Sequence, residues 1–416
     1  MRDPDVLIVG AGPVGMFTAL SLARAGVAVE VIDEGTRRAG HSYAVGLHAR
    51  SALLLEQLGL LDALLPLGQP IDGVLMQGES EELWAGLERL SGGRSSGLAV
   101  PQDRLEAVME AELARLGVVV RWDERLAQLD VLGDRPAATV DQLIRDSSGY
   151  AFAGNVTVVG RRRIERPSFV LGADGHRSMV ARQLGVAARW RQPSETFAAF
   201  EVRLEPNLAR RDVQLLVGHD GIDAIWPLRD GWSRCTFRVP EPAGDRVRTK
   251  DRAPWWISDQ GSRDHLAALL AERAPWLGAP REIGWSGVAR FERRVAASWG
   301  RGRVWLLGDA AHVASPLASH SLNRGLHEAD ELAAAIVANL AGTTNLRVLE
   351  SWESRSRAEW DWLFSSRVRG SASWLVPGLN QMLQALPATG SALRELVGRL
   401  GLSVEVVAPV ESAQTA

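Results

Sequence analysis

Hydrophobic and polar positions at the start of the chain follow the order strand, turn, helix, strand. Residues 5–9 form a short apolar run, which is typical of a strand buried on both faces. Residues 16–24 repeat apolar side chains at helical spacing before Gly26, and residues 27–32 form a second apolar run. Because neighbouring parallel strands need a crossover connection, this order predicts a βαβ unit.

The same patterns continue along the chain and predict two kinds of region. Helical periodicity predicts helices near 50–65, 102–116, 178–187, 262–274, 321–341 and 346–370, and a helical tail from about 376 to 400. Strand-like runs occupy 118–122, 138–145, 155–160, 168–171 and 303–307. Alternating runs at 197–202, 213–217, 224–227 and 235–239, and one near 284–291, predict antiparallel strands, whereas the Gly/Ser-rich residues 71–98 are expected to be irregular. The pattern favours an α/β fold with an α+β insertion over about 190–290.

Length and composition limit the class of protein. The 416 residues are enough for two or three domains, and 46% hydrophobic with 23% charged residues is the balance of a globular chain. The net charge of −3 argues against a nucleic-acid partner, which usually requires a basic face. A single cysteine, Cys235, excludes an intramolecular disulfide and argues against a cysteine-based metal site, so no metal is expected.

The apolar stretch over residues 6–32 is not expected to cross a membrane. It contains Arg24, Glu30 and several glycines, and it lacks about 20 uninterrupted apolar residues. No basic leader precedes a short apolar core, as a signal peptide would require. We therefore expect a cytoplasmic protein without a membrane partner.

A glycine motif lies where the first strand meets the first helix. Gly10-x-Gly12-x-x-Gly15 allows a tight turn, close approach of a pyrophosphate and close packing of helix on strand. The helix N-terminus offers N–H groups and a positive dipole end to phosphates. Asp33, or Glu34 as the alternative, follows the second strand at the spacing expected for an acid that binds ribose. The motif predicts an adenine dinucleotide with an unphosphorylated ribose, as in FAD or NAD.

Two further acidic motifs follow predicted strands. They are Gly172-Ala-Asp-Gly-His-Arg-Ser178 and Leu307-Gly-Asp-Ala-Ala-His312. Ligands of open α/β sheets bind at the carboxyl ends of strands, which is where both motifs lie. Taken singly, each motif could instead be a turn with a helix cap, because Asp and Ser are common N-caps.

Together the three motifs resemble those of the para-hydroxybenzoate hydroxylase-type flavin monooxygenases, over about residues 4–370. The resemblance rests on Ala173-Asp-Gly-x-x-Ser178, Gly308-Asp-Ala-Ala-His312-x-x-x-Pro316 and Val100-Pro-Gln-x-x-Leu-Glu106. It implies a Rossmann-like three-layer FAD-binding domain over 1–70, 98–190 and 290–345. It also implies a mostly antiparallel substrate-binding domain over 71–97 and 190–290, followed by a C-terminal helical segment over 346–416.

The resemblance also implies which residues bind FAD. Gln102 and Asp309 would face the ribityl chain, Leu126 would flank the adenine, and the N–H groups of Leu322 and Asn323 would face the flavin pyrimidine. The implied set is Gly10, Gly12, Pro13, Val14, Gly15, Asp33, Glu34, Arg50, Gln102, Leu126, Asp174, Gly175, Gly308, Asp309, Pro316, Ser321, Leu322 and Asn323.

The chain departs from the family pattern in two places. The family's Gly-Gly-Gln-Gly loop after Pro316 reads Leu317-Ala-Ser-His-Ser321, so the loop must differ in backbone detail. His320 would then contact flavin or substrate, or be a loop-exposed imidazole. A family arginine is replaced by Tyr43, and no second glycine motif identifies the donor as NADH or NADPH.

The implied activity is that of a monooxygenase. NAD(P)H would reduce FAD, dioxygen would add to form a flavin hydroperoxide, and one oxygen atom would hydroxylate or epoxidise an apolar aromatic or polycyclic small molecule, as in antibiotic biosynthesis. A flavin-dependent reductase or dehydrogenase without oxygen transfer, and a non-catalytic flavin-binding protein, are the alternatives. The oligomeric state stays open.

The substrate pocket is expected between the flavin and the inserted sheet. Its candidate aromatic residues are Phe197, Phe200, Trp226 and Phe237, with Arg203 and Arg238 as polar options, and ordinary core is the alternative for each aromatic. His48 is a candidate general base or a solvated histidine. Leucines and a methionine at 375–386 are expected to pack across the substrate entrance or onto a partner subunit.

Overall fold

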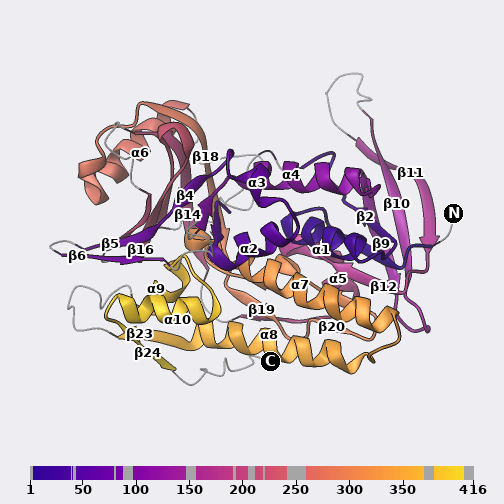
Figure 1. Cartoon of the computed structure of the whole chain (residues 1–416). Coiled ribbons are helices and arrows are strands. Elements are labelled where there is room, and N and C mark those ends of the chain that lie inside the picture. Colours follow the sequence, from indigo (N-terminus) through magenta and orange to yellow (C-terminus); the bar gives the residue numbers. More distant parts are fainter. Residues whose placement is uncertain are drawn as a thin grey trace, which may run out of the picture.

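Figure 1 shows the computed structural model of the chain. The residues that it describes are 3–38, 40, 44–78, 81–87, 97–146, 156–190, 194–204, 211–218, 221–240, 259–369 and 379–406. The expectations for Tyr43 and Leu375 lie outside the described residues.

A six-stranded sheet forms the centre of the first domain. Its order is β20 (Gly300–Arg301), β21 (Val304–Leu306), β12 (Phe169–Gly172), β1 (Val6–Val9), β2 (Val29–Ile32) and β8 (Val120–Arg121). All neighbours pair in parallel except β20 with β21. The predicted βαβ unit is confirmed, because α1 (Pro13–Arg24) connects β1 to its parallel neighbour β2.

Helices and a meander complete the layers around this sheet (Figure 1). α1 packs against α4 (Gln102–Arg115) and α7 (His320–Leu340), and α7 packs against α8 (Arg347–Ser365). An antiparallel meander of β9 (Glu124–Asp130), β10 (Ala137–Asp146) and β11 (Val156–Glu165) contacts α5 (Met179–Gln183) through β9. Helices α1, α4, α7 and α8 therefore form one packed group beside the central sheet.

The inserted sheet has seven strands. Its order is β18 (Glu282–Phe291), β14 (Glu195–Arg203), β17 (Trp232–Val239), β16 (Gly221–Pro227), β15 (Asp212–Gly218), β5 (Gly73–Gln77) and β6 (Glu82–Gly86). Only β15 and β5 pair in parallel. One face joins the main core, and the other packs with α6 (Asp259–Arg273) around a second core.

The irregular structure expected over residues 71–98 is wrong for the described residues 71–78, 81–87 and 97–98. β5 and β6 are strands, and β7 (Gly97–Ala99) lies between β3 (Gly46–His48) and β4 (Gln69–Ile71) in a separate small sheet. These strands are short, and β5 is completed by β15, which is distant in sequence. Local patterning carries little information about such long-range pairing.

Two predicted helices are interrupted. The helix expected over 50–65 is split into α2 (Ala49–Gln57) and α3 (Leu61–Leu64), because Gly59 adopts a φ of +62° between them. The helical tail expected from about 376 to 400 is divided into α9 (Leu379–Ala385) and α10 (Gly390–Arg399). Outside that range, β23 (Ser366–Arg369) pairs with β24 (Ser403–Val406), so the helix expected over 346–370 ends at Ser365. The remaining strands β13 (Ala188–Trp190), β19 (Arg294–Ala296) and β22 (His312–Val313) form a small sheet.

Among the described residues, no helix is both long enough and apolar enough to cross a bilayer.

Candidate active site

The glycine turn after β1 is fixed by packing at two of its three glycines. A Cβ on Gly10, whose φ is +108°, would overlap the carbonyl oxygen of Ala173, and a Cβ on Gly15 would overlap that of Gly10. A Cβ on Gly12 would meet no atom within 4 Å. The turn therefore packs tightly on β12 but leaves open space above Gly12.

The N-terminus of α1 faces this open space. Gly12 caps the helix without a side-chain hydrogen bond, Pro13 occupies its first turn, and no acidic residue lies there. Pro13 and Val14 line a cavity. An uncapped helix N-terminus over a cavity is suited to bind an anionic group.

Asp33 is positioned over the same turn. Its carboxylate accepts the backbone N–H of Ala11 at 2.7 Å and that of Gly35 at 2.7 Å. Asp33 and Glu34 both line a second cavity. The carboxylate is therefore held at the end of β2 with access to a ligand.

Two cavities meet along this edge of the central sheet. The Gln102 cavity, of about 270 Å³, and the Asp33 cavity, of about 470 Å³, share Gly12, Ala173 and Gly175. Among the predicted cofactor residues, the Gln102 cavity is lined by Gly12, Pro13, Val14, Gln102, Gly175, Gly308, Asp309, Pro316, Ser321 and Leu322. The Asp33 cavity is lined by Gly10, Gly12, Asp33, Glu34, Leu126, Asp174 and Gly175. Together they form an elongated site of the size class that holds cofactors.

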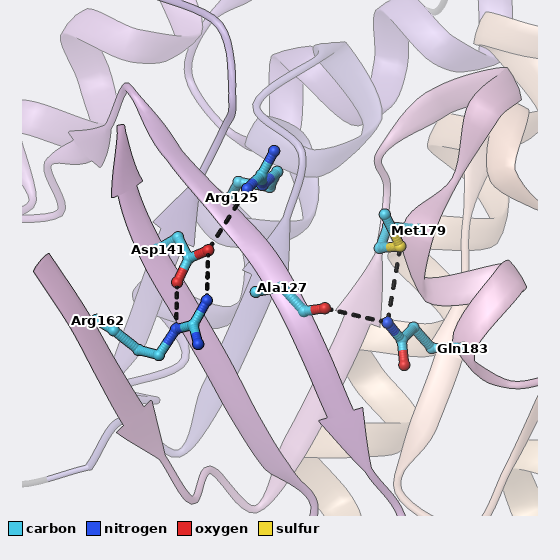
Figure 2. A network of polar contacts seen from close by, with 6 residues as sticks. All are labelled: Arg125, Ala127, Asp141, Arg162, Met179 and Gln183. Atoms are coloured by element: carbon cyan, nitrogen blue, oxygen red, sulfur yellow. Dashed lines mark hydrogen bonds and ion pairs between the residues drawn. The ribbon is translucent and has the colours of Figure 1, made fainter. Parts of the chain in front are cut away.

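Charged residues support the wall of the Asp33 cavity. Figure 2 shows Asp141 between Arg125 and Arg162, with Asp141 Oδ1 at 2.6 Å from Arg162 Nε and Asp141 Oδ2 at 3.4 Å from Arg125. The hydrogen bond from Arg162 lowers the pKa of Asp141. Because Arg125 lines the cavity, this buried carboxylate orients a cation at the ligand site.

The same view shows how α5 is attached to the meander. Gln183 Nε2 donates to the carbonyl of Ala127 at 3.2 Å and lies 3.7 Å from the sulfur of Met179 (Figure 2). Met179 also lines the Asp33 cavity. The contact joins two walls of that cavity.

Asp174 has a side chain that caps a helix. It accepts the hydroxyl of Ser178 at 2.6 Å and the N–H groups of Met179 and Val180. Burial nevertheless raises the pKa of this carboxyl. The helix-cap alternative therefore holds for the Asp174 side chain, while Gly175, with a φ of +75°, lines both cavities.

Asp309 lines the Gln102 cavity and, unlike the half-buried Asp174, is exposed. The residue is exposed to the cavity, yet protein surrounds it, and this desolvation raises the pKa of its carboxyl. A Cβ on the preceding Gly308 would come within 3.2 Å of Val14. The turn thus brings an accessible carboxyl close to the N-terminus of α1.

Gln102 is oriented by a buried acid that the sequence reasoning left without a role. Its Nε2 donates to Oε1 of Glu106 at 2.7 Å. Glu106 is 2% exposed, and burial raises the pKa of its carboxyl to about 7. The position of Glu106 one helical turn after Gln102 was the available signal.

The predicted cofactor residues after Pro316 divide into two groups. Pro316, Ser321 and Leu322 line the Gln102 cavity. Asn323 does not: its backbone N–H, which was expected to face the flavin pyrimidine, donates to the carbonyl of Ser319 at 3.1 Å, and its fully buried side chain bonds to the backbone of Gly46, His48 and Ser319. The Asn323 side chain therefore supports the wall from behind.

The two candidate catalytic histidines are buried and neither lines these cavities. His48 Nε2 lies 2.8 Å from the carbonyl of Ala318, and burial places its pKa well below the usual value, so it is not a solvated histidine. His320 Nε2 lies 3.1 Å from the carbonyls of Leu383 and Leu386. The loop-exposed alternative for His320 is therefore wrong, because α9 packs against the loop and buries the imidazole; its contact with flavin or substrate stays a prediction.

Arg50 is also misplaced by the sequence reasoning. It is exposed on α2 and lies beside Gly390 at the start of α10, outside the linings of both cavities. The helix turns this side chain toward the C-terminal segment, which a local motif does not reveal.

The four aromatic candidates lie on opposite faces of the inserted sheet. Phe197 and Trp226 join the main core, whereas Phe200 and Phe237 pack in the second core. Grouping all four in one pocket is wrong, because side chains alternate along a strand and residues 197 and 200 are an odd number apart. Trp226 Nε1 donates to the carbonyl of Leu317 at 2.7 Å, which joins the sheet to the loop.

One aromatic residue of the cavity was missed. Phe291, at the end of β18, lines the Gln102 cavity and contacts Phe197 edge-on at 5.9 Å between ring centroids. The sequence marks Phe291 only as the end of a strand, with no sign that the strand ends at the cavity.

The polar candidates of the insertion have other partners. Arg203 stacks on Trp232 and lies 3.8 Å from Glu282, and Arg238 lies 3.1 Å from Glu195. Neither arginine lines the Gln102 cavity.

Comparison with known proteins agrees with this geometry. A protein-family model described as an FAD binding domain matches residues 3–362. The 6-methylpretetramide 4-monooxygenase of Streptomyces rimosus is 30% identical over 352 residues, which cover 84% of this chain and 58% of that protein. A rifampicin monooxygenase of Rhodococcus hoagii is 28% identical over 361 residues, which cover 85% and 68%. The chain thus spans 58% of the length of the first of these relatives.

A solved structure shares the fold. The p-nitrophenol 4-monooxygenase of Pseudomonas putida DLL-E4 has a TM-score of 0.71 at 23% identity, over 86% of each chain. The predicted α/β fold with its inserted sheet is confirmed, and so is the resemblance drawn from the three motifs.

Proposed function

Because the chain belongs to the FAD-binding-domain family, we propose that it is an FAD-dependent monooxygenase acting on an apolar aromatic or polycyclic small molecule. The observation that carries the proposal is the pair of joined cavities, along which the three motifs of the chain meet. The overall reaction consumes NADH or NADPH, a proton and dioxygen, and yields an oxygenated substrate, oxidised nicotinamide and water.

The residues present fit an FAD molecule. Space above Gly12, the uncapped N-terminus of α1 and the accessible Asp33 carboxylate suit a pyrophosphate joined to a ribose. Gln102 and Asp309 offer an amide and a carboxyl to the ribityl hydroxyls, and Leu126 flanks the adenine. When bound, FAD supplies electron transfer from the nicotinamide and activation of dioxygen.

The chain's contribution to the chemistry is positioning, electrostatics and exclusion of water. α7 begins at His320 without a side-chain cap, so its first N–H groups, with Leu322 at the cavity, are placed to stabilise negative charge on the ring. Phe291, Leu307 and Leu322 give the Gln102 cavity an apolar lining. Such a lining protects reactive oxygen chemistry from water.

The named relatives support the substrate class. One acts on 6-methylpretetramide and one on rifampicin, according to their names. A polycyclic aromatic substrate of antibiotic biosynthesis is therefore our choice for this chain. We give His48 a positioning role in place of the general-base role, because its Nε2 is bonded to Ala318 and its buried Nδ1 lies outside the linings of both cavities. A cytoplasmic location and the lack of a nucleic-acid partner remain predictions from the sequence.

Isotope incorporation tests the proposal. We expect yellow protein with FAD, faster NAD(P)H oxidation when a polycyclic phenol is added, and one ¹⁸O atom from ¹⁸O₂ in the product. The variant Asp309→Asn tests the site itself. It replaces a carboxyl that we place at the ribityl chain by an amide of the same shape, and it should weaken FAD binding by about tenfold relative to the wild type. Protein that is colourless after incubation with excess FAD and removal of the free flavin would end the proposal.

A reductase without oxygen transfer is the second candidate. The observation that favours it is the loop Leu317–Ser321, which lacks the glycines of the resembling family. Turnover that proceeds at full rate without dioxygen would identify this activity, and dependence on dioxygen would exclude it.

A further inference from the structure

Ser319 has an unusual backbone conformation at the edge of the Gln102 cavity. Its φ of 54° and ψ of 33° are left-handed, a region that residues with a side chain rarely adopt. The other non-glycine residues with positive φ in the described chain are Asp123 and Asp230. Glycine adopts this conformation more readily, so the backbone alone does not require the Ser319 side chain.

The Ser319 hydroxyl has two partners. Its oxygen accepts the backbone N–H of Val45 at 3.1 Å and that of Gly46 at 3.2 Å. A serine oxygen has two lone pairs, so both bonds form at once. Ser319 is 4% exposed, and buried hydrogen bonds of this kind are shielded from water. The hydroxyl therefore ties the loop to the start of β3.

Three neighbouring bonds close the connection. Asn323 Nδ2 donates to the carbonyl of Gly46 at 2.8 Å, and Asn323 Oδ1 accepts the N–H of His48 at 2.8 Å. His48 Nε2 lies 2.8 Å from the carbonyl of Ala318. Residues 45–48 and 318–323 thus form one hydrogen-bonded unit, which we call the β3–loop clamp.

The clamp joins two walls of the cavity. Ala44, next to the clamp, lies on one wall, and Ser319, Ser321 and Leu322 lie on the other. Movement of residues 45–46 away from the loop before α7 would break the bonds to the Ser319 hydroxyl.

We propose that Ser319 is a positioning residue whose hydroxyl locks β3 to the loop before α7 and so holds the flavin ring in one place. The inference rests on the proposed binding of FAD. If the clamp fixes the flavin ring, the nicotinamide of NADH or NADPH has to approach the ring in that fixed position.

Substitution by glycine separates the hydroxyl from the backbone conformation. Glycine adopts a φ of 54° without strain, so Ser319→Gly keeps the turn and removes only the two bonds. Asp230→Gly is the matched control, because Asp230 has a φ of 58°, is exposed and lies outside both cavities.

The measurements are the Kd for FAD and the quenching of bound-flavin fluorescence by iodide, with thermal unfolding of the apoprotein as a check on the fold. For S319G we expect a cooperative apoprotein transition a few degrees below that of the wild type, because the buried N–H groups of Val45 and Gly46 lose their acceptor. We also expect an FAD Kd about tenfold higher and a severalfold larger quenching constant. D230G should match the wild type in both flavin measurements.

The inference is wrong if S319G matches the wild type in either flavin measurement. It is also wrong if the S319G apoprotein unfolds without a cooperative transition, because the hydroxyl would then serve the fold and not the ring. Wild-type protein that binds no FAD would overturn the proposed function as well. Wild-type binding with an unaffected S319G would overturn this inference alone.

Discussion

At the scale of single residues, Gly10 and Gly12 have different tasks within one motif. A methyl group on Gly10 would overlap the Ala173 carbonyl at a positive φ, whereas one on Gly12 would enter open space. The first glycine is therefore needed for the fold and the second for the ligand.

This difference predicts opposite effects of two alanine substitutions. Gly10→Ala should destabilise the apoprotein by roughly 1–3 kcal/mol or more, because it adds strain and a clash with backbone. Gly12→Ala should leave apoprotein stability unchanged and weaken FAD binding by at least about tenfold. Denaturant unfolding of the apoprotein and FAD titration measure the two effects. Equal loss of apoprotein stability in both variants would contradict the view that Gly10 serves the fold and Gly12 serves the ligand.

Glu106 predicts a pH dependence of stability. Its pKa is raised from 4.5 to about 7 by burial, so the folded state keeps a proton that the unfolded state releases between these values. The unfolding free energy should therefore fall as pH rises from 4.5 to 7, by up to about 3 kcal/mol from this group.

The variant Glu106→Gln should lack this contribution. Relative to the wild type, it should gain stability as pH rises from 4.5 to 8, as measured by urea unfolding of the apoprotein at each pH. Exposed Asp62→Asn serves as the control and should follow the wild-type curve. Parallel curves for E106Q and the wild type would show that Glu106 is ionised at neutral pH.

At the scale of elements, α9 is held in place by polar contacts at two positions. His320 Nε2 reaches the carbonyls of Leu383 and Leu386, and Gln381 Nε2 donates to Glu195 at 2.5 Å. The helix packs against β16 and the Pro316–Ala318 turn (η7). The expectation that residues 375–386 pack across the substrate entrance or onto a partner subunit stays a prediction.

Gln384 on the same helix predicts a stabilising substitution. It is 1% exposed, and neither amide atom has a hydrogen-bond partner, a state that costs roughly 1–3 kcal/mol. Gln384→Met should therefore raise Tm by about 1–3 °C in a chain of this length. Gln381→Met, which removes a bonded amide, should lower Tm. A fall in Tm for both variants in thermal unfolding would contradict the expectation.

At the scale of the whole molecule, FAD would join segments that are far apart in sequence. The Gln102 cavity alone combines Gly12, Gln102, Gly175 and Leu322. A ligand that binds only the folded arrangement stabilises it by mass action.

Binding of FAD should therefore raise the free energy of unfolding of the joined segments together. At a free concentration 100 times Kd, the stabilisation is about 2.7 kcal/mol, which corresponds to a rise in Tm of about 3 °C. Thermal unfolding followed by both tryptophan fluorescence and circular dichroism measures it. With Gly12→Ala as the control, FAD at the same concentration should give a smaller rise. An unchanged wild-type Tm in excess FAD would contradict the shared site.

The accuracy of the sequence reasoning varied with the range of the interactions involved. The βαβ unit and the three motifs are local patterns, and the structure brings their residues to two joined cavities. Phe291 was missed because the other segments that line its cavity are distant from β18 in the chain. Arg50 and His320 were misplaced because they contact α10 and α9, which lie far along the chain.

The sequence by itself determined the backbone features of this protein that a few consecutive residues specify. Glycine at positive φ, a helix N-terminus and an acid at a strand end follow from local sterics and hydrogen bonding. Tertiary structure alone decided which side chains face the ligand cavities, which faces of β14 and β17 reach the main core, and that Ser319 bonds to β3. These outcomes depend on strand register and on packing between segments hundreds of residues apart, which no local pattern encodes.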